Sequence, residues 1–147
     1  MFRHNDGQLE VLLVHPGGPF FRNKDDGVWT IPKGEAAEHE NLLTRARLEF
    51  REELGLDANA TDWIELGTVK QKGGKSVHAW GFAGDLPADF VIASNTFTME
   101  WPPRSGTTRE FPEIDRAGFF PIESAMEKIN EAQIEFLVRL VAHLEVK

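Results

Sequence analysis

Three glutamates stand close together near the end of one predicted helix. Glu49, Glu52 and Glu53 occupy positions i, i+3 and i+4, a spacing that brings side chains to one side of an α-helix within about one turn. Residues 41–54 have the apolar periodicity of a helix, and Gly55 follows as a C-terminal stop. The apolar residues expected on its buried stripe are Leu42, Leu43, Ala46, Phe50 and Leu54.

The position of these acids is unfavourable for a helix that serves stability alone. Like charges at i and i+4 repel, and an acid near the negative end of the helix dipole costs roughly 0.3–1 kcal/mol. A hard divalent cation relieves both penalties, and Mg²⁺ prefers carboxylate oxygen. The spacing therefore favours a magnesium site. For this segment by itself, a solvated face of a Glu- and Arg-rich helix remains the alternative.

The remaining pattern predicts several strands. Residues 9–14 (LEVLLV) form a continuous apolar run that predicts a buried strand, and residues 28–31 predict a short strand that Pro32 ends. Further strands are predicted at residues 63–70, 76–82 and 96–101, the first two as a hairpin around residues 72–75.

The C-terminal region predicts a second helix that packs on a sheet, beginning at Glu131. Its expected apolar stripe consists of Ile134, Leu137, Val138, Val141 and Leu144. Strands and helices interleave without a regular βαβ repeat, which predicts an α+β fold with a mixed sheet.

Composition narrows the class of protein. The 147 residues fit a single domain over residues 1–147, although Phe2 is typical of the end of a strand, so the N-terminal strand is expected to begin upstream. The chain has no cysteine, which excludes disulfides and thiolate sites and favours a cytoplasmic location. A net charge of -8 argues against binding long nucleic acid, and no apolar run is long enough to span a membrane.

The segment from Gly34 to Leu56 resembles the signature of the Nudix hydrolase family. That signature reads Gly, five residues, Glu, seven residues, Arg-Glu, an apolar residue, any residue, Glu-Glu, any residue, Gly and an apolar residue. This chain matches it without insertion at Gly34, Glu40, Glu49, Phe50, Glu52, Glu53, Gly55 and Leu56. Leu48 departs from the pattern, since the family has there an arginine that would hold Glu52. Arg45, four residues before Glu49, is a candidate to brace that acid instead.

The resemblance implies a fold, a cofactor and a reaction. The fold is an α/β/α sandwich with a mixed central sheet. The cofactor is Mg²⁺, which Mn²⁺ can replace, bound by Glu49, Glu52 and Glu53 with the backbone carbonyl of Lys33 as a further ligand. Such a metal offsets phosphate charge and lowers the pKa of a bound water. Glu52 is the first candidate for the base that takes the water proton, and Glu49 is the second.

Two acids outside the triplet receive separate interpretations. Glu113, in FPEIDRAGFF, is similar to the glutamate that precedes the last strand in diadenosine-polyphosphate-type members, and an exposed loop acid is the equal alternative. Glu40 is expected to accept backbone N–H groups at the helix start rather than to bind metal.

Several side chains are candidates for contacts with the substrate. The phosphate-binding candidates are Lys33, Arg104, Arg109 and Lys72, with Lys70 and Lys75 in addition. For each of these, a solvated surface charge is the alternative. Trp101 or Phe20 could stack on a base, although aromatic residues beside strands more often belong to the core. His15, His39 and His78 show no metal-ligand spacing, and we assign them no role.

The predicted function is hydrolysis of a diphosphate linkage in a nucleoside diphosphate-X substrate. A dinucleoside polyphosphate or a (d)NTP is the expected substrate, and the protein is expected to be a monomer or a homodimer. A non-catalytic Nudix domain that senses a nucleotide or acts as a scaffold is the alternative. A purely structural domain would leave the penalised acid cluster without a reason.

Overall fold

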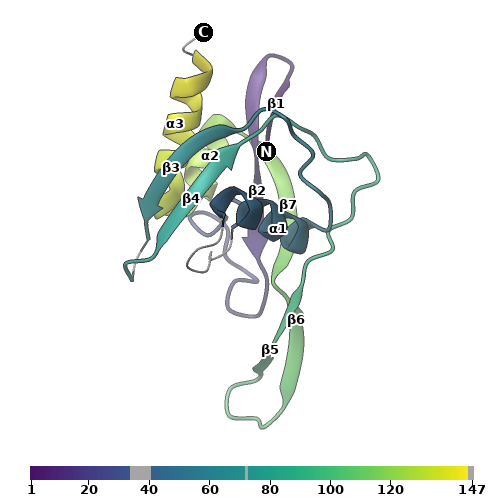
Figure 1. Ribbon diagram of the computed structural model, residues 1–147. Helices are drawn as coiled ribbons and strands as arrows, with labels where there is room; N and C mark the ends of the chain where they lie inside the picture. Colours follow the sequence, from purple (N-terminus) through teal and green to yellow (C-terminus); the bar gives the residue numbers. More distant parts are fainter. Residues whose placement is uncertain (34–40, 72, 146–147) are drawn as a thin grey trace.

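The strands and helices follow the chain in the order shown in Figure 1. The computed structural model describes residues 1–33, 41–71 and 73–145. The strands are β1 (Phe2–Asn5), β2 (Gln8–Pro16), β3 (Ile64–Lys70), β4 (Ser76–Gly81), β5 (Thr96–Glu100), β6 (Thr108–Pro112) and β7 (Ile114–Pro121). The helices are α1 (Leu42–Leu54), α2 (Ile122–Lys128), the short 3-10 helix η1 (Glu131–Gln133) and α3 (Ile134–Glu145).

Strand β2 is the middle strand of an antiparallel sheet with the order β1-β2-β7. Its side chains alternate between two core clusters: Leu12 and Val14 enter one, and Val11 and Leu13 enter the other. Burial on both faces explains why the apolar run is continuous rather than alternating. The strand predicted at residues 9–14 is confirmed.

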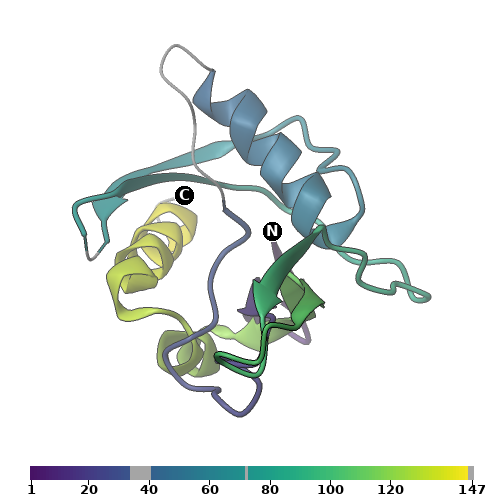
Figure 2. The same cartoon turned by 90° about the horizontal axis from the view of Figure 1, so that it is seen from below.

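Helices cover both faces of this sheet. Phe50 and Leu54 of α1 pack against Leu12 and Val14 on one side, whereas α2 and α3 contribute to the cluster on the other side. Figure 2 shows α1 and α3 apart, with the β3–β4 hairpin running between them. The predicted α+β class and its helix–sheet–helix layering are therefore confirmed. The ladders are antiparallel, and parallel pairing occurs at the isolated bridges Phe2↔Ala83 and Trp29↔Ile129.

Helix α1 begins and ends at local sequence signals. The Asn41 side chain accepts a hydrogen bond from the Thr44 N–H at 3.0 Å, which caps the N-terminus. Gly55 adopts a left-handed φ of 78° at the C-terminus, so the predicted stop is confirmed. The predicted stripe is confirmed at Phe50 and Leu54 and is wrong at Leu42, which is 43% exposed in the first turn.

Two hairpins complete the strands. β3 and β4 pair antiparallel, as predicted, and β5 pairs with β6 in a two-stranded ribbon that projects from the body of the molecule (Figure 1). The strand predicted at residues 28–31 is replaced by two single bridges, Val14↔Thr30 and Trp29↔Ile129. Trp29 and Thr30 pair with different neighbours, so no continuous ladder forms there.

The C-terminal helix is confirmed, and its predicted stripe is confirmed at Leu137 and at the partly buried Ile134 and Leu144, which pack on the core. The buried residues of α3 are Phe136, Leu137 and Leu140, whereas Val138 is 46% exposed. The helix has more apolar residues than its packed face needs, so periodicity did not identify that face uniquely. Among the described residues, no helix combines the length and apolar character needed to span a membrane.

Candidate functional site

The last turn of α1 places a carboxylate in the interior. Glu53 is only 9% exposed, and its Oε2 accepts a hydrogen bond from the backbone N–H of Lys33 at 3.1 Å. Burial raises the pKa of the Glu53 carboxyl to about 8, although that hydrogen bond and the Lys33 charge act in the opposite direction. Helix amphipathicity would place an apolar residue here, so this buried acid stands out from the normal pattern of a core.

Glu49 lies one turn earlier and shares the same environment. Partial burial raises the pKa of its carboxyl, and the neighbouring negative charge of Glu52 adds to the increase. Arg45 Nε lies 3.3 Å from Glu49 Oε1, so the brace expected from the i, i+4 spacing is confirmed. Leu48, in the place of the family arginine, is 41% exposed and has no group that could hold Glu52.

A fourth acid reaches this cluster from another part of the chain. Glu113 is the single residue between β6 and β7, and its negative charge contributes to the raised pKa of both Glu49 and Glu53. Its backbone N–H donates to the Asn95 carbonyl at 2.8 Å, and the Asn95 N–H donates to the Glu52 carbonyl at 3.0 Å. This backbone connection holds Glu113 beside the end of α1.

The four acids fit a hard divalent cation by their chemistry. All offer carboxylate oxygen, and the buried Glu53 carboxyl has no ion pair with any described residue. Within the described ranges, however, no three His, Asp or Glu side chains are arranged to hold one metal ion. Bringing these carboxylates around one metal ion therefore requires side-chain rotation. The half-buried Glu52 and the exposed Glu113 allow such rotation.

A polar pocket of about 190 Å³ lies beside the acids, between α1 and the β3–β4 hairpin. Lys33 and Arg45 line it, and both also contact the acid cluster as described above. His78 and Trp80 line the opposite wall as a stacked pair with ring centroids 4.4 Å apart. The pocket combines cationic groups with a flat aromatic surface, which suits a phosphorylated planar ligand.

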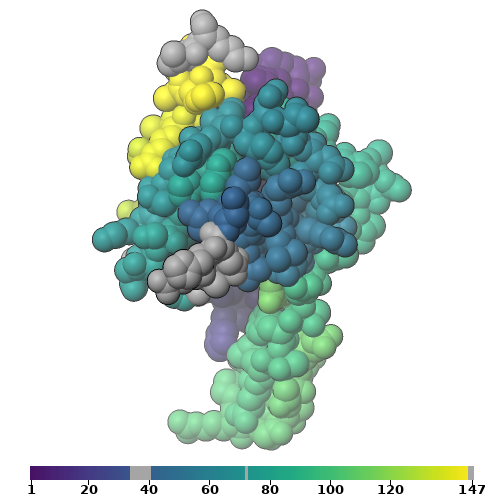
Figure 3. All heavy atoms as spheres, viewed as in Figure 1, coloured from purple at the N-terminus to yellow at the C-terminus, as the bar shows by residue number. Residues whose placement is uncertain are grey.

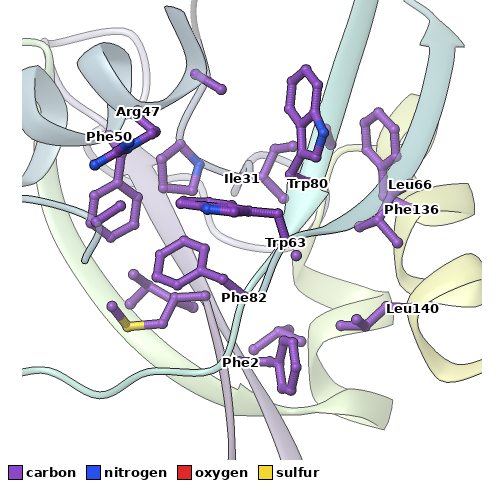
Figure 4. A pocket seen from close by; sticks show the side chains of 18 of the residues that line it. Phe2, Ile31, Arg47, Phe50, Trp63, Leu66, Trp80, Phe82, Phe136 and Leu140 are labelled. Carbon is purple, nitrogen blue, oxygen red and sulfur yellow. The ribbon is translucent and has the colours of Figure 1, made fainter. Parts of the chain in front are cut away.

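A deeper apolar pocket continues from this one, with Pro32, Ala46, His78 and Trp80 shared between the two linings. Figure 4 shows Trp63 across its centre, above Phe82, with Trp80 and Arg47 at the rim. The Trp63 and Phe82 ring centroids are 4.9 Å apart. Figure 3 shows α1 and the β3–β4 hairpin meeting on this face of the molecule.

Sequence reasoning missed the roles available to His78 and Trp80. The signal was the alternation in β4, where Ser76, His78 and Trp80 share one face while Val77 and Ala79 are buried on the other. That alternation marked a partly solvated face, but it did not reveal that the face opens toward Lys33 and Arg45. Such proximity depends on how the hairpin packs against α1.

Other predicted site residues lie elsewhere. Arg104 is in the turn of the β5–β6 ribbon and Arg109 is on β6, both exposed and away from the acids along the projecting ribbon (Figure 1). Phe20 and Trp101 contact each other beside that ribbon, with ring centroids 5.6 Å apart. The predictions for Gly34, His39, Glu40 and Lys72 fall outside the described residues.

Comparison with known proteins agrees with this geometry. A family model described as "NUDIX domain" matches residues 1–140. No curated protein sequence matches the chain significantly.

Three solved structures share the fold at low identity. A C. elegans Ap4A hydrolase in a binary complex has a TM-score of 0.64 and 20% identity, covering 98% of this chain and 92% of that one. The NUDIX domain of Shewanella oneidensis NrtR complexed with ADP ribose has a TM-score of 0.64 and 18% identity, covering 97% and 82%. A MutT protein from Methanosarcina mazei Go1 has a TM-score of 0.58 and 18% identity, covering 98% and 91%.

Proposed function

The chain belongs to the Nudix hydrolase family, and from this premise we propose that it hydrolyses a diphosphate linkage in a nucleoside diphosphate-X substrate. The proposed metal is Mg²⁺, with Mn²⁺ as a substitute. A dinucleoside polyphosphate is the preferred substrate class, and a (d)NTP is the nearest rival. The observation that carries the proposal is the buried acid Glu53 beside Glu49 and Glu113, because a bound cation would stabilise the ionised form of a carboxyl whose pKa burial raises to about 8.

The ligand set assigned to the metal is Glu49, Glu52 and Glu53, with the Lys33 carbonyl as a further oxygen. Bound Mg²⁺ would offset the phosphate charge and lower the pKa of a water. Glu113, already a candidate from the sequence, lies close enough to Glu49 and Glu53 to affect both, so we include it as a further acid of this site. The family's remaining box residues, Gly34 and Glu40, lie outside the described residues, and the capping role of Glu40 stays a prediction.

The protein side chains have distinct tasks in the proposed reaction. Glu52 accepts the proton of the attacking water, and Glu49 is the second candidate for this base. Arg45 holds Glu49 in place through the 3.3 Å contact. The Lys33 side chain, beside the polar pocket, offers a positive charge to a substrate phosphate. His78 and Trp80 give the pocket an aromatic wall for a nucleobase.

A nucleotide-sensing domain without turnover is the second candidate function. Leu48 is the observation that favours it, because this side chain cannot orient Glu52 as the family arginine would. The retained carboxylates Glu49, Glu52 and Glu53 favour hydrolysis instead, since a sensor has no need of a costly acid cluster.

The two candidates are separated by product analysis on a substrate panel. The panel contains diadenosine polyphosphates, (d)NTPs, ADP-ribose and capped RNA, each assayed with and without Mg²⁺. Hydrolysis is expected to require the metal and to be lost in Glu52→Gln, whereas the matched variant Glu123→Gln, at an exposed position on α2, keeps activity. Tight nucleotide binding with no product from any substrate would establish the sensor and reject the hydrolase.

A further inference from the structure

An aromatic pair lies beside the β5–β6 ribbon, where an exposed ring packs on a half-buried one. Phe20, in the loop after β2, is 59% exposed and packs edge-to-face against Trp101, with ring centroids 5.6 Å apart. The same loop is seated on the β5–β6 ribbon, because a Cβ on Gly18 would lie 2.9 Å from Phe97 Cζ. The aromatic pair is therefore a surface formed by two segments distant in sequence.

Three arginines lie on the same loop and ribbon as this pair. Arg22, Arg104 and Arg109 are exposed, and none has an ion pair with a described residue, in a chain that has 24 acidic and 16 basic side chains. The Arg109 guanidinium lies 5.9 Å from the Phe111 ring centre. Arg22 and Phe111 line a groove of about 170 Å³. Arginines beside aromatic rings, without acidic partners in the described chain, suit an anionic ligand with a planar group.

The acids near this groove do not neutralise the positive charge of its arginines. Asp115 lines the groove, but its Oδ1 lies 2.7 Å from His15 Nδ1, so that carboxylate is already engaged. Glu110 pairs in register with Thr98, whereas Arg109 pairs with Met99, so alternation directs Glu110 to the opposite face of the ribbon. Glu100 accepts the backbone N–H of Arg104 at 2.6 Å and leaves that guanidinium free of an ion pair with the described chain.

The groove adjoins the proposed active site along the chain. Pro112 lines the groove and directly precedes Glu113. The Gly17 N–H donates to the Glu113 carbonyl at 2.8 Å, and a Cβ on Gly17 would lie 2.0 Å from the Pro112 carbonyl oxygen. The loop with Phe20 and the ribbon therefore meet at the residue that completes the acid cluster.

We propose that this surface, the distal nucleotide site, binds the second nucleoside end of a dinucleoside polyphosphate while the scissile phosphates lie at the acids. The site consists of Phe20, Arg22, Trp101, Arg109 and Phe111. The base of the distal nucleoside stacks on the Phe20–Trp101 pair, and the arginines contact the phosphates on that side. This inference rests on the proposed hydrolase function. It requires a substrate that carries a nucleoside at each end. The polar pocket beside α1 would hold one nucleoside end and the distal nucleotide site would hold the other.

Substrate discrimination tests the distal nucleotide site. The measured quantity is the ratio of kcat/KM for diadenosine tetraphosphate to kcat/KM for ATP. Phe20→Ser and Arg109→Gln are each expected to lower this ratio about tenfold. Phe21→Ser, in the same loop, and Arg51→Gln, at an exposed arginine that pairs with Asp57, are matched controls that keep the wild-type ratio. A ratio unchanged in both site variants, or a wild type that hydrolyses only NTPs, overturns the inference and leaves the hydrolase proposal standing.

A binding measurement tests the site independently of turnover. In the Glu52→Gln background, the indole N–H resonance of Trp101, assigned with Trp101→Phe, is followed by NMR during titration. Diadenosine tetraphosphate is expected to shift it, and ATP at the same concentration is expected to leave it in place. If no nucleotide is ever hydrolysed, the hydrolase proposal fails, yet this titration still decides the distal site. Equal shifts with both ligands, or no shift with either, reject the distal nucleotide site.

Discussion

The Oε2 atom of Glu53 accepts a hydrogen bond from the backbone N–H of Lys33 at 3.1 Å, so a carboxylate from the last turn of α1 is joined to the segment before the Nudix box. The bond stabilises the charged carboxylate, but burial has the larger effect and raises its pKa to about 8. Glu53 is thus placed for ligand binding at a cost to the stability of the metal-free protein.

Replacement of this acid should separate activity from stability. Glu53→Gln keeps an oxygen acceptor for the Lys33 N–H and removes the buried charge, so we expect activity to be abolished and metal-free stability to be preserved or raised. The folded-state pKa of about 8 exceeds the ordinary value of 4.5, so stability from this group is present below pH 4.5 and lost as pH rises through 8. The loss in wild type should be on the order of a few kcal/mol.

The measurement is thermal unfolding in EDTA across pH 5 to about 8.5, for wild type and Glu53→Gln. The wild-type Tm should fall as pH rises, and the variant should have a flatter profile and the higher Tm at the alkaline end. A lower Tm for Glu53→Gln throughout this range would identify Glu53 as a structural acid.

Removal of the Arg45 charge should shift the pH dependence of activity. The Arg45 guanidinium lowers the pKa of Glu49, opposing the increase from burial and from Glu52. Arg45→Gln should therefore raise that pKa further, so ionised Glu49 becomes available only at higher pH. The acid limb of the kcat/KM profile should move upward by about half a unit. Arg51→Gln is the control, because its contact is with Asp57 at 3.6 Å, and an identical shift there would remove the specific role of Arg45.

Local patterns predicted the part of the site that lies on one helix. The stop at Gly55 and the 3-residue and 4-residue spacing of the acids act within a few positions, so α1 and its carboxylates followed from sequence alone, whereas the cap at Asn41 was not predicted. The sequence also suggested Glu113 by its position before the last strand. Its closeness to α1 depends on the connection through Asn95, which no local pattern encodes.

The polar pocket and the packed face of α3 were beyond sequence reasoning for a related reason. His78 and Trp80 meet Arg45 through the packing of a hairpin on a helix, and the sequence carries only the alternation of β4. Val138 fits the helical apolar period but is exposed, because the packed face of α3 is set by Phe136 and its neighbours. Periodicity left more than one face of α3 equally apolar, and tertiary contacts determine which of them is buried.

Restoring the missing arginine should improve metal binding. Leu48 is 41% exposed, so Leu48→Arg fits on α1 with little disturbance and places a guanidinium four residues before Glu52. An i, i+4 ion pair is weak, so we expect about a twofold decrease in the half-saturating Mg²⁺ concentration or a similar gain in kcat. Kinetics over a Mg²⁺ titration provide the test. Leu48→Lys is the control, because lysine adds the same charge without the paired hydrogen-bond donors of arginine. No change in either parameter would show that Glu52 needs no such support.

A side chain at Gly55 should disturb both the helix end and the site beside it. Gly55 has a φ of 78°, and an added Cβ would lie 2.8 Å from Ala93 Cβ and 3.0 Å from the Ala93 carbonyl oxygen. Gly55→Ala therefore combines left-handed strain with a clash, for a loss of about 2 kcal/mol or more in the free energy of unfolding. Ala93 leads into Asn95, which joins α1 to Glu113, so activity should also fall.

Gly7 is a matched control for this effect, since it has the same φ of 78° and a Cβ added there would have no atom within 4 Å. Gly7→Ala should cost only the backbone strain, about 1 kcal/mol. Urea unfolding of both variants isolates the contribution of the contact with Ala93. Equal losses of stability would mean that the segment from Ala93 to Asn95 moves aside at no measurable cost. The contact with this segment would then not be what holds Glu113 beside the acids of α1.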